Sequence, residues 1–296
     1  MTKTDESSRL YDSSDLVPSS DGLPAREVGP WSKDKHYFLI RYMDAFTRAM
    51  KRKPQWSGLG YIDLFAGPGK CKIRGTGEEI YGSPLIALTS PRPGKSFDAF
   101  FFAEMSSHCL EAITTRFHSL RSQCIPNVYP GDCNEKVSAL SKDLNSSFLY
   151  LAFIDPPGLD VHFDTIRALA NQQRMDLIIS FMDRLDLNRN MNTYLAQQQS
   201  KLDLFFGERS NWRHRFNNLG SWSAENVTRL SLEIYRDQLQ QIGYGHFGEP
   251  VRIHGAGETA QTPFYLLLFA SKHPLGVQFW NETSSKDRSG NRKLPF

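Results

Sequence analysis

The segment Tyr-Ile-Asp-Leu-Phe-Ala-Gly-Pro-Gly at residues 61–69 constrains the fold more than any other part of the chain. It begins with strand-forming apolar residues, and Gly67 and Gly69 follow at once, where the backbone can turn sharply and approach a ligand. Asp63 lies inside the predicted strand, where an acid is rarely buried without a partner. Such a unit is typical of nucleoside sites at the carboxyl edge of α/β sheets, although an ordinary strand–turn–helix unit shares the pattern.

Strands and helices alternate along the chain on both sides of this segment. Apolar runs predict further strands at residues 99–103, 128–129, 148–154 and 175–181. Periodicity and capping residues predict helices over 32–53, 85–88, 106–119, 134–144 and 163–172. Because these strands are apolar throughout, we expect an α/β fold with a doubly wound, mostly parallel sheet of the Rossmann-like type. Residues 251–253 and 264–270 are predicted to add a hairpin, and residues 70–79 to form a polar loop.

The 296 residues, of which 40% are hydrophobic, are enough for one large domain. Residues 1–27 are rich in Ser, Asp and Pro and are predicted to be a disordered leader. Residues 28–282 would form a single domain, in which the polar segment 183–240 is a helical insertion after the fifth strand. Residues 283–296 are predicted to be a flexible basic tail.

Several classes of protein are disfavoured by composition. No apolar run approaches the roughly 20 residues that span a bilayer, and the N-terminus is polar and acidic, so we expect a cytoplasmic protein without a membrane partner. The four cysteines lack metal-site spacing, so no metal site is expected and free thiols are the default. A net charge of +3 permits a nucleic-acid partner but does not require one.

Three acids end or follow successive predicted strands: Glu104, Asp132 and Asp155. Together with the glycine turn they should meet at one sheet edge. Asp63 could then contact an ammonium group, Glu104 two ribose hydroxyls and Asp132 an adenine amino group, which is the arrangement expected for S-adenosylmethionine. A dinucleotide site would need a third glycine, which is missing here. Alternatively, the acids are only solvated caps of strand ends.

Asp155-Pro156-Pro157 is the candidate catalytic motif. Two prolines fix the backbone beyond the strand and thereby aim the carboxylate. A fixed carboxylate beside a carbonyl can hold an amino group by its protons and align its lone pair on a methyl donor, which is catalysis by positioning. The alternative is a rigid turn with an exposed acid.

Nearly the whole chain after residue 27 resembles the bacterial three-Cys-motif partner (TcmP) family. The resemblance lies in segments 28–32, 35–39, 45–47, 61–69, 82–85 and His273-Pro274-Leu275-Gly276. Proteins of this family occur beside a second, radical-SAM-like protein with three cysteines. The resemblance therefore implies such a protein as a partner.

More distantly, the chain is similar to Rossmann-type ribosomal-RNA adenine-N6 methyltransferases. Shared features include Lys35-His36, the glycine turn, Gly82-Ser83-Pro84, the strand-end acids and Asp-Pro-Pro. Without the resemblance, Lys35 and His36 would be interpreted as solvated helix residues. The resemblance adds them to the predicted cofactor site, which comprises Lys35, His36, Asp63, Phe65, Ala66, Gly67, Gly69, Ser83, Glu104, Asp132, Cys133 and Asp155.

Gly158 departs from that family, whose motif has an aromatic residue there to stack on the flipped base. Phe181 and Trp212 are candidate substitutes. Trp212 also belongs to a basic cluster at residues 209–216, which we predict to contact nucleic acid through Arg209, Trp212, Arg213 and Arg215. A solvated basic helix face with the tryptophan turned inward is the alternative.

These observations favour an S-adenosylmethionine-dependent methyltransferase that acts on an amino nitrogen in nucleic acid, DNA or RNA. A second hypothesis is a catalytically inactive domain of the same fold that binds nucleic acid for the three-cysteine protein. A third is a different S-adenosylmethionine reaction within a two-protein system.

Overall fold

The computed structural model describes residues 15–121, 123–171, 173–255 and 262–290. An eight-stranded sheet forms its centre, in the order β10-β12-β9-β8-β3-β6-β7, with β11 paired to β12. The strands are β3 (Gly58–Asp63), β6 (Ala99–Glu104), β7 (Asn127–Pro130), β8 (Phe148–Ile154), β9 (Arg174–Phe181), β10 (His246–Phe247), β11 (Val251–His254) and β12 (Pro263–Ser271). Strands β7, β6, β3, β8 and β9 are mutually parallel, and β12 runs antiparallel to β9. The prediction of a doubly wound, mostly parallel sheet is confirmed.

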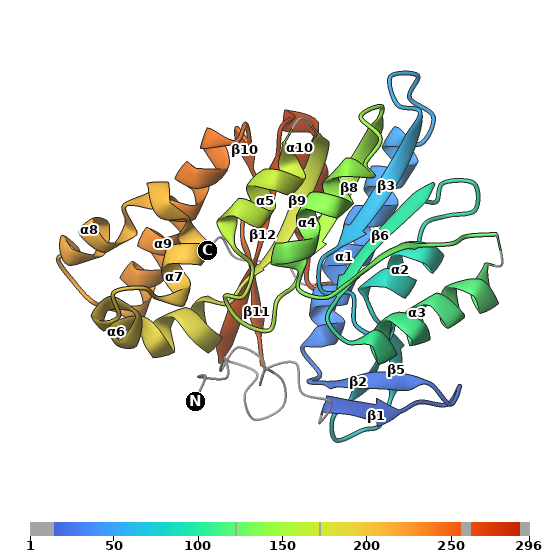
Figure 1. Cartoon of the computed structure of the whole chain (residues 1–296), viewed down its shortest axis with the longest axis horizontal. Coiled ribbons are helices and arrows are strands. Elements are labelled where there is room, and N and C mark those ends of the chain that lie inside the picture. The colour runs from blue at the N-terminus through green and yellow to red at the C-terminus, as the bar shows by residue number, and fades with distance from the viewer. Residues whose placement is uncertain (1–14, 122, 172, 256–261, 291–296) are drawn as a thin grey trace.

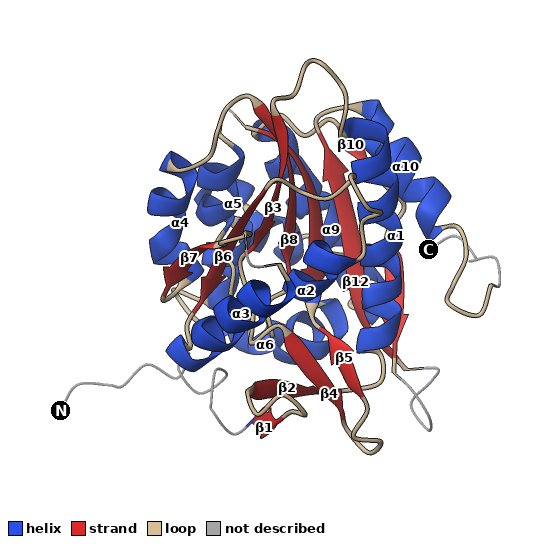
Figure 2. Cartoon of the chain, turned by 90° about the vertical axis from the view of Figure 1, so that its right-hand side faces the viewer, coloured by secondary structure: helices blue, strands red, loops and turns tan. Residues whose placement is uncertain are grey.

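Helices cover both faces of this sheet. In Figure 2, α4 and α5 lie on one side of the strands, and α1 and α10 lie on the other. The helices outside the insertion are α1 (Ser32–Met50), α2 (Ser83–Thr89), α3 (Ser107–Leu120), α4 (Cys133–Lys142), α5 (Phe163–Ala170) and α10 (Pro274–Ser284). Since α10 follows a polar His-Pro pair and has few apolar residues in a periodic pattern, sequence analysis did not predict it.

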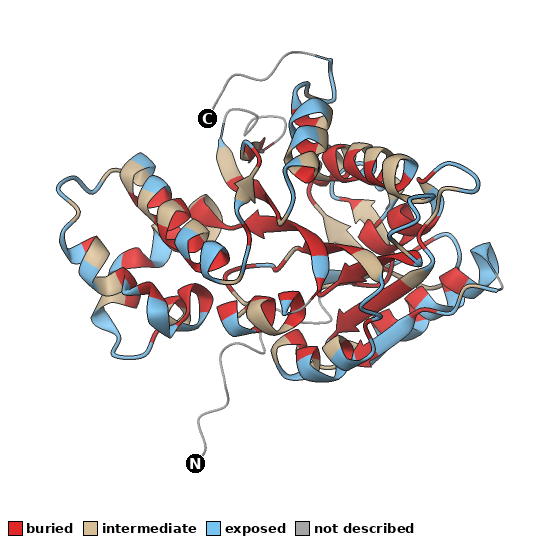
Figure 3. Cartoon of the chain, turned by 90° about the horizontal axis from the view of Figure 1, so that it is seen from above, coloured by how far each residue is buried: buried red, intermediate tan, exposed pale blue. Residues whose placement is uncertain are grey.

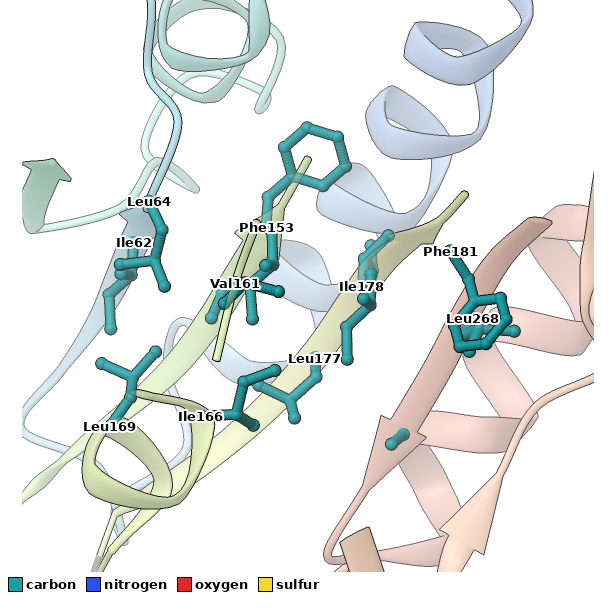
Figure 4. Packing of buried hydrophobic residues seen from close by; sticks show 14 of the residues in the cluster. Ile62, Leu64, Phe153, Val161, Ile166, Leu169, Leu177, Ile178, Phe181 and Leu268 are labelled. Atoms are coloured by element: carbon teal, nitrogen blue, oxygen red, sulfur yellow. The ribbon is translucent and has the colours of Figure 1, made fainter. Parts of the chain in front are cut away.

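The core lies between the sheet and these helices. Every residue of β3 is buried, and β8 and β9 are buried over most of their length, as expected for strands apolar on both faces. Side chains of α5 lie over the strands in Figure 4, where Ile166 and Leu169 face the sheet. Figure 3 shows the buried residues concentrated along the sheet and the exposed ones on the outer faces of the helices.

The segment predicted as a helical insertion is helical and extends from the sheet on one side (Figure 1). It contains a π-helical turn η3 (Asp183–Leu187), α6 (Asn188–Ala196), α7 (Lys201–Phe206), a 3-10 turn η4 (Glu208–Ser210), α8 (Trp212–Asn217) and α9 (Ala224–Gln241). Phe205 of α7 stacks on Tyr235 of α9, with ring centroids 5.0 Å apart, and Phe181 of β9 packs edge-on against Tyr235 at 5.6 Å. This aromatic contact continues the core of the sheet into the insertion.

A second sheet of four strands corrects two predictions. Its order is β1 (Leu16–Pro18), β2 (Pro24–Val28), β4 (Lys70–Ile73) and β5 (Glu79–Tyr81). Residues 70–79 are therefore a hairpin rather than a simple loop. Residues 15–27, predicted as part of a disordered leader, form a hairpin whose second strand pairs in parallel with β4.

Ion pairs explain why this polar N-terminal segment is ordered. The guanidinium of Arg116 on α3 donates to both carboxylate oxygens of Asp21, at 2.9 and 2.8 Å, and to the carbonyl of Pro24 at 2.9 Å. The Arg116 hydrogen bonds hold the pKa of Asp21 well below its usual value. Polar composition alone did not reveal this buried cation.

The ends of the chain lie partly outside the described residues, namely 1–14 of the predicted leader and 291–296 of the predicted tail. Within the described part of the tail, Arg288 forms an ion pair with Asp34 at 2.9 Å. Among the described helices, none has the length and apolar character needed to cross a bilayer.

Candidate functional site

The turn after β3 sets the geometry of the site. Gly67 and Gly69 have φ angles of 60° and 87°, in the left-handed region that favours glycine. The turn is held by hydrogen bonds from the Ala66 amide to the Ala103 carbonyl at 3.2 Å and from the Gly82 amide to the Gly69 carbonyl at 2.7 Å. The backbone of β6 and the start of α2 thus fix the loop that sequence analysis singled out.

Asp63 supports this turn from behind. It is fully buried, and its carboxylate accepts from the Phe65 amide and the Tyr61 hydroxyl, both at 3.1 Å. Burial raises its pKa to about 7. The predicted contact of Asp63 with a ligand's ammonium group is therefore corrected: this carboxylate is enclosed by the protein and orders the turn.

A cavity of about 300 Å³ lies over the glycine turn, at the carboxyl edge of the large sheet and beside the small one. Residues from α1, the β3 turn, α2, β6 and the loop after β8 line it. The predicted site residues that it brings together are Lys35, His36, Phe65, Ala66, Gly67, Gly69, Ser83, Glu104, Asp155, Pro156 and Pro157.

Glu104 ends β6 at the wall of this cavity and is only 4% exposed. Its Oε2 accepts from the Gly67 amide at 2.8 Å, and its Oε1 accepts from the Ser106 amide at 3.0 Å. These bonds fix the carboxylate and leave each oxygen a further lone pair. The arrangement is therefore suited to accept hydrogen bonds from a pair of ligand hydroxyls.

The predicted adenine end of the site is nearly filled. Asp132 and Cys133 line a separate void of only about 10 Å³, which Phe65 and Glu104 also border. The Asp132 carboxylate accepts from the Asn134 amide at 2.8 Å and caps α4, and burial raises the pKa of the Cys133 thiol. A void of this size holds about one water. An adenine ring does not fit this void, so the predicted contact of Asp132 with an adenine amino group would need the residues around it to rearrange.

Asp155 lies at the rim of the large cavity with two partners of its own. One carboxylate oxygen forms an ion pair with the Lys35 ammonium, and the other accepts from the Ser180 hydroxyl of β9. Burial alone would lower the pKa of Lys35, but the adjacent Asp155 raises it above its usual value. Burial and the Lys35 charge lower the pKa of His36 to about 3, so this imidazole is neutral. The site thus contains an anionic acceptor held by a cation.

Sequence analysis did not predict four further residues that line the cavity. Arg26 of β2, Trp31, Arg74 and Tyr265 of β12 all line it. The Nε atom of Arg26 lies 3.7 Å from the position that a Cβ on Gly67 would take, so this cation is beside the glycine turn. Of these four residues, only Trp31 lies in a segment, residues 28–32, that the family resemblance singles out.

A side chain at position 158, in the loop beyond Asp-Pro-Pro, would crowd two carboxylates. A Cβ on Gly158 would lie 2.8 Å from an Asp186 oxygen and 3.0 Å from an Asp160 oxygen. The suggested substitutes, Phe181 and Trp212, are buried in the core. Neither can stack on a base in this fold, so that interpretation is wrong.

The basic cluster at residues 209–216 has the alternative arrangement, in which the tryptophan is turned inward. Trp212 donates from Nε1 to Asp203 at 2.8 Å, and Arg213 stacks on its ring and donates to the same carboxylate. Arg215 pairs with Asp237 and Glu233, and Arg209 is exposed on η4. The prediction of a nucleic-acid platform built on Trp212 is wrong, because the tryptophan and two of the three arginines bind the protein's own groups.

No family model and no curated protein matches this chain. Solved structures of similar fold include an O-methyltransferase from Bacillus cereus in complex with SAH, at 9% identity over 89% of this chain and 99% of that one, with a TM-score of 0.45. A Legionella pneumophila protein, LPL1258, has 15% identity over 84% and 89%, with a TM-score of 0.45. ChlM, a magnesium protoporphyrin IX methyltransferase from Synechocystis with bound SAM, has 12% identity over 82% and 85%, with a TM-score of 0.39. These likenesses concern the fold, and membership of the TcmP family stays a prediction.

Proposed function

We propose that this chain binds S-adenosylmethionine in the cavity over Gly67 and transfers its methyl group to an amino nitrogen in nucleic acid. One observation carries the proposal. A single cavity of about 300 Å³ at the carboxyl edge of the sheet contains the glycine turn, the fixed Glu104 carboxylate and Asp155-Pro156-Pro157. That is the edge at which α/β sheets bind nucleoside ligands.

Residues of the cavity match the ribose and the amino-acid end of this cofactor. Glu104 would accept the ribose hydroxyls, and Arg26 beside the turn would bind the amino-acid carboxylate. The neutral His36 adds no charge that would repel the sulfonium. When bound, the cofactor supplies an electrophilic methyl group.

Asp155 would position the acceptor amine. Its carboxylate is an acceptor only, so an incoming amino group can donate to the oxygen that now binds Lys35, while Ser180 retains the other oxygen. Pro156 and Pro157 restrict the backbone beside Asp155, so it stays in place when the amino group replaces Lys35. The expected contribution is alignment of the nitrogen lone pair.

The exocyclic amine of a nucleic-acid base is the acceptor class that we propose. Such an amine has the two protons that a carboxylate and a neighbouring carbonyl can hold. The base would enter without a stacking residue at position 158, so its recognition must rest on other contacts.

A specific observation favours a second candidate, a catalytically inactive nucleic-acid-binding partner of a three-cysteine protein. Both carboxylate oxygens of Asp155 already have protein partners, Lys35 and Ser180, and Gly158 offers no aromatic side chain to a base. In this alternative the ion pair is permanent and stabilises the rim of the cavity.

Calorimetry with S-adenosylmethionine tests the binding step. We expect binding by the wild-type protein and its loss in Glu104→Ala, because the mutant lacks both the hydroxyl acceptor and the support of the turn. Glu111→Ala, on the exposed face of α3, is the matched control and should bind normally. Absence of heat at millimolar ligand for the wild type would refute the proposal.

Transfer of labelled methyl from S-adenosylmethionine to DNA or RNA tests the reaction. Asp155→Ala should retain cofactor binding and lose transfer. Cofactor binding without any transfer by the wild type, including in the presence of the co-purified three-cysteine protein, would favour the inactive alternative.

A further inference from the structure

The amino edge of the large sheet lies at the opposite end of the strands from the cavity over Gly67. Strands β9, β8, β3, β6 and β7 are parallel neighbours, so the segments that lead into them lie side by side at this edge. In Figure 1, the loops before β3, β6 and β8 project from the same end of the sheet. We define the basic edge as residues 51–57, 90–98, 123–126 and 142–147 together with Arg121 and Arg174.

The basic edge has a charge that the rest of the chain does not share. It contains eight basic residues and two acids, which gives it a net charge of +6. The whole chain has a net charge of only +3, so the remainder of the chain is acidic. The basic residues are Lys51, Arg52, Lys53, Arg92, Lys95, Arg121, Lys142 and Arg174, and the acids are Asp98 and Asp143. Positive charge is therefore concentrated on this one edge.

Helix ends account for only part of this charge. Five helices, α1 to α5, end at the basic edge or directly before the strands that begin there. The C-terminus of a helix carries roughly −0.5 of an elementary charge, so five of them amount to about −2.5 in total. The net charge of +6 is more than twice this value. A surplus of positive charge remains after the helix dipoles are neutralised.

Ion pairs neutralise only two of the eight cations. Lys51 pairs with Asp98, and Arg92 pairs with Asp44 of α1 at 3.3 Å. Within the described residues, no carboxylate pairs with the other six, which are Arg52, Lys53, Lys95, Arg121, Lys142 and Arg174. All of these six except the half-buried Lys95 are exposed. An anion in solution can therefore reach them.

The extent of the basic edge suits a chain of phosphates better than a single small anion. Neighbouring strands lie about 4.8 Å apart, so the row from β9 to β7 is roughly 19 Å long. Each strand of a nucleic-acid duplex carries one phosphate per about 3.4 Å of helix axis. Several phosphates of one backbone can therefore face the row at the same time.

An anionic membrane matches this surface less well. A surface that enters a membrane interface has apolar side chains among its cations. The segments before β3, β6 and β8 have no exposed large hydrophobic residue. Within the described residues, Leu120 and Ile125 are exposed, and both lie at the connection between α3 and β7. The distribution of charge without apolar partners favours a nucleic-acid backbone.

We propose that the basic edge binds the phosphate backbone of the nucleic-acid substrate. This inference rests on the proposed function for the nature of the substrate, but it does not depend on methyl transfer. Leu149 at the start of β8 and Asp155 beyond its end are six residues apart, which corresponds to roughly 20 Å along the strand. The basic edge would thus hold a part of the nucleic acid that flanks the target base. Such phosphate contacts position the substrate without reading its sequence.

Fluorescence anisotropy at several salt concentrations tests the basic edge, with a labelled single-stranded oligonucleotide as RNA and as DNA. The edge variant combines Arg52→Gln, Lys53→Gln and Lys95→Gln, which removes three of the six unpaired cations. Each phosphate contact contributes about 0.7 to the salt slope for a single strand, so the slope should fall by about two. At about 0.1 M salt this corresponds to an affinity about a hundredfold weaker.

A matched control variant removes three exposed cations from other parts of the surface, namely Arg189→Gln, Arg209→Gln and Lys286→Gln. It should retain the affinity and the salt slope of the wild type. Urea midpoints should be equal for the wild type and both variants, because all the replaced side chains lack ion pairs within the described part of the chain.

Calorimetry with S-adenosylmethionine separates this proposal from the proposed function. The edge variant should bind the cofactor as the wild type does. A wild type that binds the oligonucleotide through the basic edge but does not bind S-adenosylmethionine would refute the proposed function and support the edge. Three results would overturn the edge: equal affinity and salt slope in the wild type and the folded edge variant, no oligonucleotide binding by the wild type, or wild-type binding to phosphatidylserine vesicles instead of the oligonucleotide.

Discussion

The glycine-turn cavity and the segment at residues 209–216 both combine charged and aromatic residues, yet the fold uses them in opposite ways. At the cavity, Glu104 and Asp155 come from strands far apart in sequence and face a shared hollow. In the segment, Trp212 and Arg213 turn onto Asp203, nine and ten residues away in the sequence. Position at a strand end therefore brings residues together at the cavity, whereas the charges of the 209–216 segment are used in the protein's own contacts.

The largest effect that can test this contrast is expected at Trp212. Trp212→Ala should lower the free energy of unfolding by about 3–5 kcal/mol, because it removes a buried ring. Urea unfolding measures this loss. Trp222→Ala, at a 48% exposed ring, should change stability by less than about 0.5 kcal/mol. If Trp212→Ala left stability intact and reduced nucleic-acid binding, our assignment of this residue would be reversed.

Asp63 provides a pH-dependent test of the turn. Its pKa is raised to about 7 by burial, so between about pH 4 and that value the folded protein retains a proton that the unfolded chain has lost. The Asp63 contribution to stability is therefore complete below about pH 4 and is lost as the pH rises through about 7. Urea midpoints across this range should fall less steeply for Asp63→Asn than for the wild type. A parallel decline in both proteins would contradict the burial of this carboxyl.

Arg26 tests whether the N-terminal hairpin belongs to the site. Arg26→Gln should weaken S-adenosylmethionine binding about tenfold, since a charge-assisted hydrogen bond to the carboxylate is lost. Adenosine lacks that carboxylate and should bind both proteins equally in the same calorimetric experiment. Arg48→Gln, at a surface ion pair on α1, is the control. Equal losses for both ligands would assign Arg26 a structural role instead.

The smallest effect is expected at Arg209, the exposed arginine of the 209–216 segment. Arg209→Ala should leave the unfolding free energy within about 0.5 kcal/mol of the wild type and leave nucleic-acid affinity unchanged. Filter binding at several salt concentrations measures the second quantity. A shallower salt dependence in the mutant would restore the segment as a phosphate contact.

The mostly parallel sheet and the edge at which Glu104 and Asp155 meet were predictable, because the strands are largely apolar and these acids follow directly at their carboxyl ends. The role of Asp63 could not be predicted, because an acid within a strand can face either a ligand or the turn. Its hydrogen bond with Tyr61 in the folded protein shows that it faces the turn. The small sheet was missed because β2 and β4 are polar and pair across more than forty residues. Such pairing leaves no local periodicity to detect.

The pairing of β2 with β4 also determines when the protein can be completed during synthesis. Residues 24–28 are made before their partner strand at residues 70–73, and Arg116, which anchors the hairpin, is made later still. Translation delivers domains from the N-terminus at about 5–20 residues per second. The hairpin of β1 and β2 must therefore wait several seconds for its anchor, and this wall of the cavity is completed only after Arg116 has been made.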